Sequence, residues 1–179
     1  LAYSTAAVHG AVTYLFEKSE MVDYPEPPVR GDAARGESLV SKVGCKGCHY
    51  VGEGDPPARA HDDRSFGPEL TGIGSKVGAG WLYAWVKNPQ DYFPETTMPD
   101  LRLTDQEAAD ITAYLLTLRN PEFENERVPD LDREHRDQLI LDYLLTRLPE
   151  DQARAKLRDM SEVEGDLYLG QKIILRQGC

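Results

Sequence analysis

Two cysteines and a histidine stand within five residues of one another in the segment VGCKGCHYVG, residues 43–52. Cys45, Cys48 and His49 form a C-x-x-C-H motif, and whatever these side chains hold decides what the surrounding chain is built around. The chain has one further cysteine, Cys179, so the three cysteines cannot all pair with one another in disulfides. A disulfide framework is therefore disfavoured, and the motif calls for another kind of chemistry.

Three kinds of site use closely spaced cysteines of this type. In c-type haem attachment, the two thiols add to the vinyl groups of haem as thioethers and the adjacent histidine ligates the iron. A C-x-x-C redox pair does not need the histidine and usually lies in an α/β pattern, which this sequence lacks. A tetrahedral zinc site needs a second pair of ligands at suitable spacing, and none follows. The motif therefore favours covalent haem, with a zinc or thiol module as the alternative.

The chain is acidic, with a formal net charge of −11 over 179 residues. Ten basic and 13 acidic residues give −3 in 29–120, whereas seven basic and 13 acidic residues give −6 in 121–164. Such charge disfavours nucleic acid, whose phosphates would repel it, and favours partners with a basic docking face. Residues 121–164 are interpreted as a solvated, acidic connector.

The hydrophobic pattern predicts an all-α protein with long loops. The best-defined helix covers 104–118, where Thr104 and Glu107 make a capping box and Ala108, Ile111 and Leu115 follow one apolar stripe. A short helix is expected to end at Pro89. The other helices are expected at 1–19, 33–43, 131–147 and 151–160, and loops at 52–67 and 92–103.

An internal repeat begins at Gly165, where GDLYLGQKIILRQGC matches GDAARGESLVSKVGC of residues 31–45 at a shift of 134 residues. Glycine, aspartate and cysteine coincide at five positions of the two copies: Gly31, Asp32, Gly36, Gly44 and Cys45 in the first, and Gly165, Asp166, Gly170, Gly178 and Cys179 in the second. The helical apolar phase is retained as well. The repeat predicts a second copy of the same module, with Cys179 as its first haem-binding cysteine.

These features divide the chain into four segments: an N-terminal helix and Pro-rich linker at 1–28, a mono-haem domain at 29–120, the acidic helical connector at 121–164, and the first helix of a second domain at 165–179. The N-terminal helix is too short and too polar to span a bilayer unaided. It is either the remnant of a membrane anchor or the last helix of yet another module.

Over residues 30–119 the sequence resembles the small class I c-type cytochromes, whose iron is held by His and Met. The resemblance rests on GCKGCH, GPELTGIGSK, WLYAWVKNP and TTMPDLRLTDQEAADITAYLLTL in that order. It implies an all-α cytochrome c fold with helical extensions and one haem c in 29–120. By resemblance, the Pro68 carbonyl accepts a hydrogen bond from His49, and Met98 is the sixth iron ligand, presented by an extended backbone before Pro99.

Other side chains could compete with Met98 for the iron. His61 is the best rival, Met21 and Met160 are further candidates, and His9 and His135 are expected on the surface. The resemblance also implies that Gly36 faces Tyr114 where the first and last helices cross. Leu70, Leu82, Trp85, Leu101 and Leu115 are expected to wall the haem. The tryptophans have two interpretations: ordinary packing, or a hydrogen bond from the N–H of Trp81 or Trp85 to a haem propionate.

The function expected from these residues is one-electron transfer through haem, in a segment of a larger respiratory assembly rather than a catalyst. A second haem is expected beyond Cys179. The alternative is the electron-donating haem domain of a di-haem peroxidase-like enzyme. The expected partners are other redox proteins or haem domains and subunits of a membrane complex, on the periplasmic or extracytoplasmic side of a bacterial membrane.

Overall fold

A computed structural model describes residues 4–20, 22–51 and 66–177 of the chain. Within these residues the structure contains α-helices and short 3₁₀ helices and no β-strand, which confirms the all-α prediction. The helices divide between two compact units, one made of residues 23–126 and the other of residues 1–22 together with 127–179. We describe each unit by itself.

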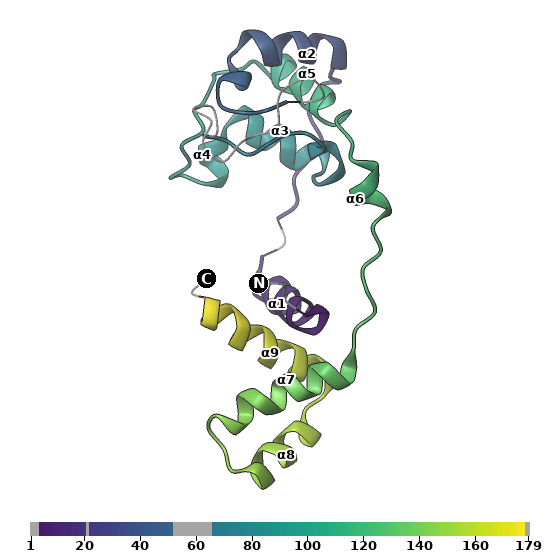
Figure 1. The fold of residues 1–179 in the computed structure, drawn as a ribbon. Helices are drawn as coiled ribbons and strands as arrows, with labels where there is room; N and C mark the ends of the chain where they lie inside the picture. The colour runs from purple at the N-terminus through teal and green to yellow at the C-terminus, as the bar shows by residue number, and fades with distance from the viewer. Residues whose placement is uncertain (1–3, 21, 52–65, 178–179) are drawn as a thin grey trace. The chain divides into compact units, whose positions relative to one another are not determined.

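The unit of residues 23–126 contains helices α2 to α6. They are α2 (Ala33–Lys42), α3 (Ala79–Lys87), α4 (Pro89–Tyr92), α5 (Asp105–Leu115) and α6 (Pro121–Asn125), with 3₁₀ helices at Cys45–Gly47 and Ile73–Ser75. Helices α2 and α5 lie against each other (Figure 1), and α3 packs on α5. Buried apolar residues from all three helices, among them Val40, Leu82 and Ile111, form the core of this unit.

The ends of these helices follow from local sequence. The predicted capping box begins α5: the Thr104 side chain accepts a hydrogen bond from the Glu107 amide, and the Glu107 carboxylate accepts one from the Thr104 amide. The chain after α3 differs from the prediction. Pro89 does end α3, but it also begins the short helix α4, because proline lacks only an N–H that the first turn of a helix does not use. Pro121 begins α6 in the same way.

The second unit contains α1 (Thr5–Lys18), α7 (Arg133–Leu145), α8 (Glu150–Asp159) and α9 (Glu162–Gln177). Its core holds buried apolar residues from all four helices: Ala7, Ile140, Leu141, Leu144, Ala153, Leu169 and Ile173. The segment that composition marks as an acidic connector therefore supplies two helices to a core of its own, because its apolar residues recur at helical spacing between the charges.

Helix α9 covers the second copy of the repeat and begins three residues before Gly165. The cause is a local cap: the Ser161 side chain accepts from the Glu164 amide, and the Glu164 carboxylate accepts from the Ser161 amide. In the first copy Asp32 itself caps α2 by accepting from Arg35 N–H. The equivalent Asp166 lies inside α9.

No helix in the described part of the chain combines the length and the apolar character needed to cross a bilayer.

Candidate functional site

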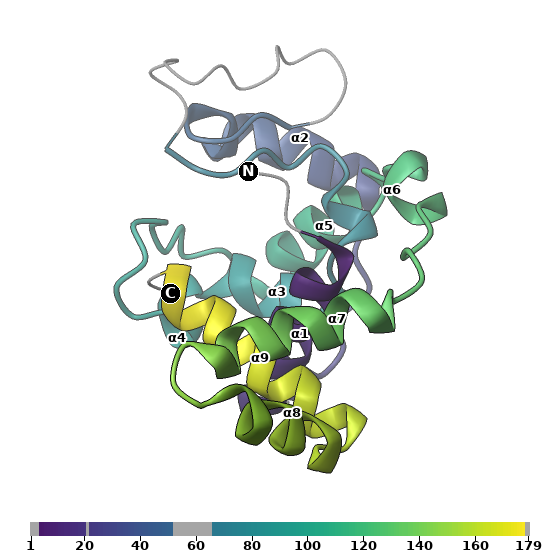
Figure 2. The same ribbon diagram turned by 60° about the horizontal axis from the view of Figure 1, so that its bottom comes forward.

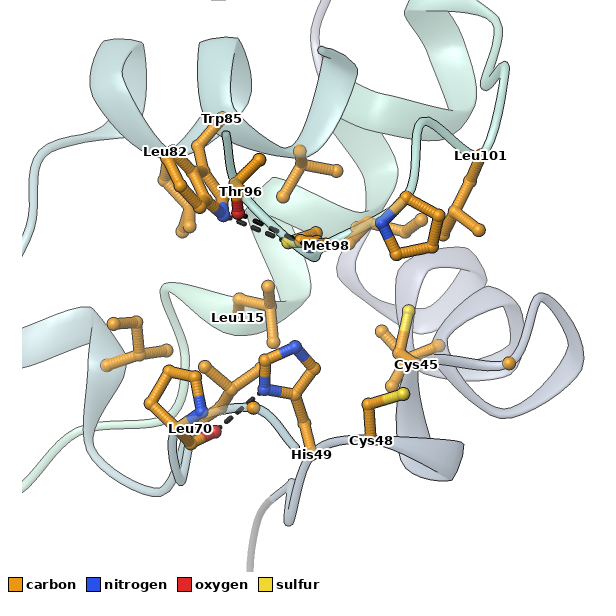
Figure 3. A pocket seen from close by; sticks show the side chains of 18 of the residues that line it. Cys45, Cys48, His49, Leu70, Leu82, Trp85, Thr96, Met98, Leu101 and Leu115 are labelled. Carbon is orange, nitrogen blue, oxygen red and sulfur yellow. Dashed lines mark hydrogen bonds between the residues drawn. The ribbon is translucent and has the colours of Figure 1, made fainter. Parts of the chain in front are cut away.

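The C-x-x-C-H motif lies directly after α2, on the 3₁₀ helix Cys45–Gly47 and the residues that follow it. Gly44 makes this turn possible, because its φ of 99° lies in the left-handed region that other residues rarely adopt. The His49 and Cys48 amides both donate to the Cys45 carbonyl, at 3.0 and 3.2 Å. Burial raises the pKa of the Cys45 thiol, so this sulfur stays protonated at neutral pH. The turn places both thiols and the imidazole at one pocket (Figure 3).

The imidazole of His49 is held in one orientation by the residues 67 and 68. Its Nδ1 lies 2.7 Å from the Pro68 carbonyl oxygen, so Nδ1–H donates to this carbonyl and Nε2 keeps its lone pair for a metal. Gly67 packs against the ring so closely that a Cβ there would lie 2.5 Å from Nδ1. The Gly67 and Leu70 amides donate to the Cys48 and Tyr50 carbonyls and tie this segment to the motif.

Met98 lies on the side of the pocket opposite His49 (Figure 3). Three contacts hold it there. Its amide donates to Thr96 Oγ1 at 3.3 Å, its carbonyl accepts from Gln90 Nε2 at 2.8 Å, and its sulfur accepts from Trp85 Nε1–H at 3.0 Å. The thioether sulfur therefore has a fixed position although its loop contains no regular secondary structure.

The space between these two walls is a cavity of about 290 Å³. Its lining is mainly apolar and comes from α2, α3, α5 and the loops between them, with Val40, Leu70, Leu82, Leu101 and Leu115 among the residues. The residues that line it include two cysteines, a histidine and a methionine, which offer two thiols, an imidazole nitrogen and a thioether sulfur. This donor set fits a haem, because haem needs an apolar slot, two sulfurs for its vinyl groups and one axial ligand on each face.

Aromatic side chains back the methionine wall. Trp81 and Trp85 stack with ring centroids 5.6 Å apart, and Tyr92 lies edge-on to both. Because the Trp85 N–H already donates to the Met98 sulfur, only Trp81 of the two tryptophans has an N–H left for a haem propionate.

A second group of contacts fixes α3 against the start of α5: Lys87 pairs with Asp105 at 2.9 Å, and the Tyr83 hydroxyl donates to the same carboxylate. The Lys87 bond lowers the pKa of Asp105.

The crossing of α2 and α5 supports the pocket from behind. A Cβ at Gly36 would overlap the Asp110 carbonyl and come within 2.8 Å of Tyr114 Cβ, so Gly36 does face Tyr114 as expected. The Asp110 side chain is buried in the crossing, where it accepts from Arg35, from the Asp32 amide and from Gln106. The bond from Arg35 is the main reason why the pKa of Asp110 falls to about 2.

The structure brings seven of the eight predicted site residues to one pocket: Cys45, Cys48, His49, Pro68, Leu70, Trp85 and Met98. The eighth, Cys179, lies outside the described residues, as do Met21, the rival ligand His61 and most of its loop. Met160, His9 and His135 belong to the other unit. Sequence reasoning missed the roles of Gly67, Gln90 and Asp110. Of these three, only Gly67 could have been found from the sequence, because it directly precedes Pro68, whose carbonyl was expected to bind His49.

The family model described as cytochrome c matches residues 33–119, which begin at α2 and end just after α5. No curated protein matches the chain.

Proposed function

We propose, since residues 33–119 form a cytochrome c domain, that this chain is an electron-transfer segment of a larger respiratory assembly. The family to which the domain belongs binds haem c covalently and transfers electrons with it. What we add is the identity of the two iron ligands, a second haem, and the larger assembly in which the domain works. His49 and Met98 are the two axial ligands, and Cys45 and Cys48 form the thioethers.

The observation that carries the ligand set is the placement of His49 and Met98 on opposite sides of one apolar cavity. Haem supplies an iron that cycles between Fe(III) and Fe(II). Pro68 orients His49 and raises its basicity by accepting from Nδ1–H. Trp85 donates to the Met98 sulfur, which makes this sulfur a weaker electron donor and so favours Fe(II). With His49 and Met98 as its two iron ligands, the haem would have no position left for a substrate, so this domain would carry electrons.

Two features of the sequence support the larger assembly. The repeat at 165–179 supports a second haem domain, for which Cys179 supplies the first thioether. The net charge of −11 supports docking to redox partners with a basic face, including subunits of a membrane complex. Covalent haem attachment supports a location on the periplasmic or extracytoplasmic side of a bacterial membrane.

The first test concerns covalent attachment. The protein is matured in cells that attach c-type haem and is then extracted with acidified acetone. We expect the colour to remain with the protein, because thioethers to Cys45 and Cys48 survive the extraction. A haem that moves into the solvent would contradict covalent attachment.

The second test concerns the axial methionine. Met98→Ala should abolish the weak near-infrared sulfur-to-iron band and lower the reduction potential, since a thioether stabilises Fe(II) relative to the ligands that would replace it. Met160→Ala is the matched control, because Met160 packs in the core of the other unit. An unchanged spectrum in Met98→Ala would assign the ligand to another residue, with His61 as the first to replace.

A further inference from the structure

Helices α1 and α9 cross in the same way as α5 and α2. A Cβ at Gly36 of α2 would overlap the Asp110 carbonyl and lie 2.8 Å from Tyr114 Cβ. A Cβ at Gly170 of α9 would overlap the Gly10 carbonyl and lie 2.5 Å from Tyr14 Cβ. In both crossings a glycine meets a carbonyl and then the tyrosine four residues further on. Helix α1 lies against α9 (Figure 1), and the view of Figure 2 also places the two helices next to each other.

The two crossings therefore share one register. A shift of 134 residues takes α2 onto α9, and a shift of 100 residues takes α5 onto α1. The N-terminal caps agree as well, because Ser4 accepts from Ala7 N–H at α1 as Thr104 accepts from Glu107 N–H at α5. By this register α1 is the counterpart of the last helix of the cytochrome c domain, and α9 is the counterpart of its first.

The difference between the two pairs lies in what covers them. Ala108, Thr112 and Leu115 of α5 are at most 4% exposed, and Leu115 lines the haem pocket. Their counterparts on α1 are Val8, Val12 and Leu15, which are 46–50% exposed. Helix α1 thus presents an apolar face at three positions that are buried in α5, and the last of these positions, Leu115, lines the pocket of the first domain.

Helix α9 adds to this face. Ile174 is the counterpart of Val40, which is buried in the first domain and lines its pocket. Ile174 is half-buried. Cys45 follows Gly36 by nine positions, and Cys179 follows Gly170 by nine positions. The repeat therefore carries a thiol at the same distance along the chain from each helix crossing.

We propose that α1 and α9 together form the wall of a second haem pocket, in which a haem attached at Cys179 covers the exposed Val8, Val12 and Leu15 and the half-buried Ile174. This inference rests on the proposed function and goes further in one respect. It assigns the two helices of a single haem domain to opposite ends of this sequence, with the first cytochrome c domain lying between them in the chain. It also gives α1 an internal role in place of a membrane anchor.

The chemistry of attachment follows the first domain. The S–H of Cys179 adds across a vinyl group of haem, so that sulfur bonds to one vinyl carbon, the proton goes to the other, and no oxidant or reductant is consumed. The ligand class is therefore a vinyl-bearing iron porphyrin, held by an apolar wall and a thioether.

The test uses the product of the natural gene, matured in cells that attach c-type haem, with its tryptic peptides analysed by mass. We expect the mass of haem on the peptide that contains Cys179 and also on the peptide that contains Cys45 and Cys48. Haem on Cys45 and Cys48 with an unmodified Cys179 would overturn the inference and leave the proposed function intact. Absence of haem from both peptides would overturn the proposed function itself.

The role of α1 is tested by substitutions on its exposed face. Val12→Glu should lower the haem yield at Cys179 several-fold, because it places a charge on the wall of the pocket. Val128→Glu is the matched control, since Val128 is 90% exposed in the same unit and should leave the yield unchanged. Val12→Thr, which copies Thr112 of the first domain, should keep the haem. In every variant the haem on Cys45 and Cys48 is the internal standard. Equal yields in Val12→Glu and Val128→Glu would show that α1 is not the wall.

Discussion

At the scale of single residues, the side chains of His49 and Met98 are held in position by contacts with neighbouring residues of the pocket. His49 is aimed by a hydrogen bond to Pro68 and by the absence of a side chain at Gly67, against which the ring lies. Met98 is aimed by Gln90, Thr96 and Trp85, none of which adjoins it in sequence. The positions of the His49 imidazole and the Met98 sulfur are therefore decided by their neighbours.

Replacement of Gly67 by alanine should displace the His49 ring, because the new Cβ would lie 2.5 Å from Nδ1. We expect a weaker His49–Pro68 bond, a shifted reduction potential, and binding of carbon monoxide to Fe(II) that the parent resists. Gly78→Ala is the control, since a Cβ at Gly78 meets no atom within 4 Å. Parent-like carbon monoxide binding in Gly67→Ala would contradict the packing.

At the scale of elements, the crossing of α2 and α5 combines close backbone contact with a buried carboxylate. Gly36 allows the contact, and Asp110 links α5 to Arg35 and to the Asp32 amide at the start of α2. Glycine inside a helix costs about 1 kcal/mol relative to alanine. The crossing offsets this cost, because only a residue without a Cβ lets the two helices approach so closely.

Gly36→Ser should destabilise this unit by about 1–3 kcal/mol, because the added atoms force the helices apart. The measurement is the midpoint of thermal or urea unfolding, followed by the haem absorbance. Gly78→Ser is the control: it adds the same atoms in open space, at an N-cap position that serine favours. Equal unfolding midpoints for Gly36→Ser and the parent would contradict a close contact between α2 and α5 at Gly36.

Asp110→Asn should cost about 1–3 kcal/mol at neutral pH, because it leaves Arg35 and the Asp32 amide with poorer partners. The pKa of Asp110 is lowered to about 2 from its ordinary 3.8, so the charged carboxylate stabilises the fold at every pH above about 4. This stabilisation is lost as the pH falls from about 4 to about 2. We therefore expect the difference in urea midpoint between parent and Asp110→Asn to be constant from pH 7 to 5 and to shrink below pH 4. A difference that persists at pH 2 would contradict the assignment.

At the scale of the whole molecule, charge is concentrated in the segment after the cytochrome c domain. Residues 121–164 carry an excess of six negative charges. Part of this charge is structural. Glu124 pairs with Arg119 and accepts from the Ser75 hydroxyl, so it holds α6 on the domain. Its neighbours Glu122 and Glu126 are exposed, and in the described structure they make no ion pair.

Electron exchange with a small basic cytochrome should slow as salt is added, because exposed charges are screened over about 8 Å at physiological ionic strength. The double variant Glu122→Gln, Glu126→Gln should lower the bimolecular rate at low salt. The control is Glu17→Gln, Glu20→Gln, which removes the same charge from exposed positions elsewhere. A bimolecular rate that does not change with salt would contradict electrostatic steering of the partner. Equal rates in the two double variants would place the docking surface away from α6.

The features that the sequence predicted by itself are those with a local cause. The C-x-x-C-H spacing, the capping box of Thr104 and Glu107, the helical stripe of α5 and the proline that ends α3 each depend on residues a few positions apart. They predicted the all-α fold and the chemistry of the pocket. The departures from the prediction have local causes too. Pro89 and Pro121 begin the short helices α4 and α6, which were not predicted, and Ser161 with Glu164 starts α9 before Gly165.

Tertiary structure alone decided the contacts between segments far apart in the chain. Gly67 against His49, Trp85 on the Met98 sulfur, the carboxylate of Asp110 between α2 and α5, and α1 against α9 join residues separated by 13 to about 160 positions. The physical reason is that helical phase tells which face of a helix is apolar but not which surface will cover it. For α1 the sequence left two roles open, and only its contact with Gly170 on α9 favours one of them.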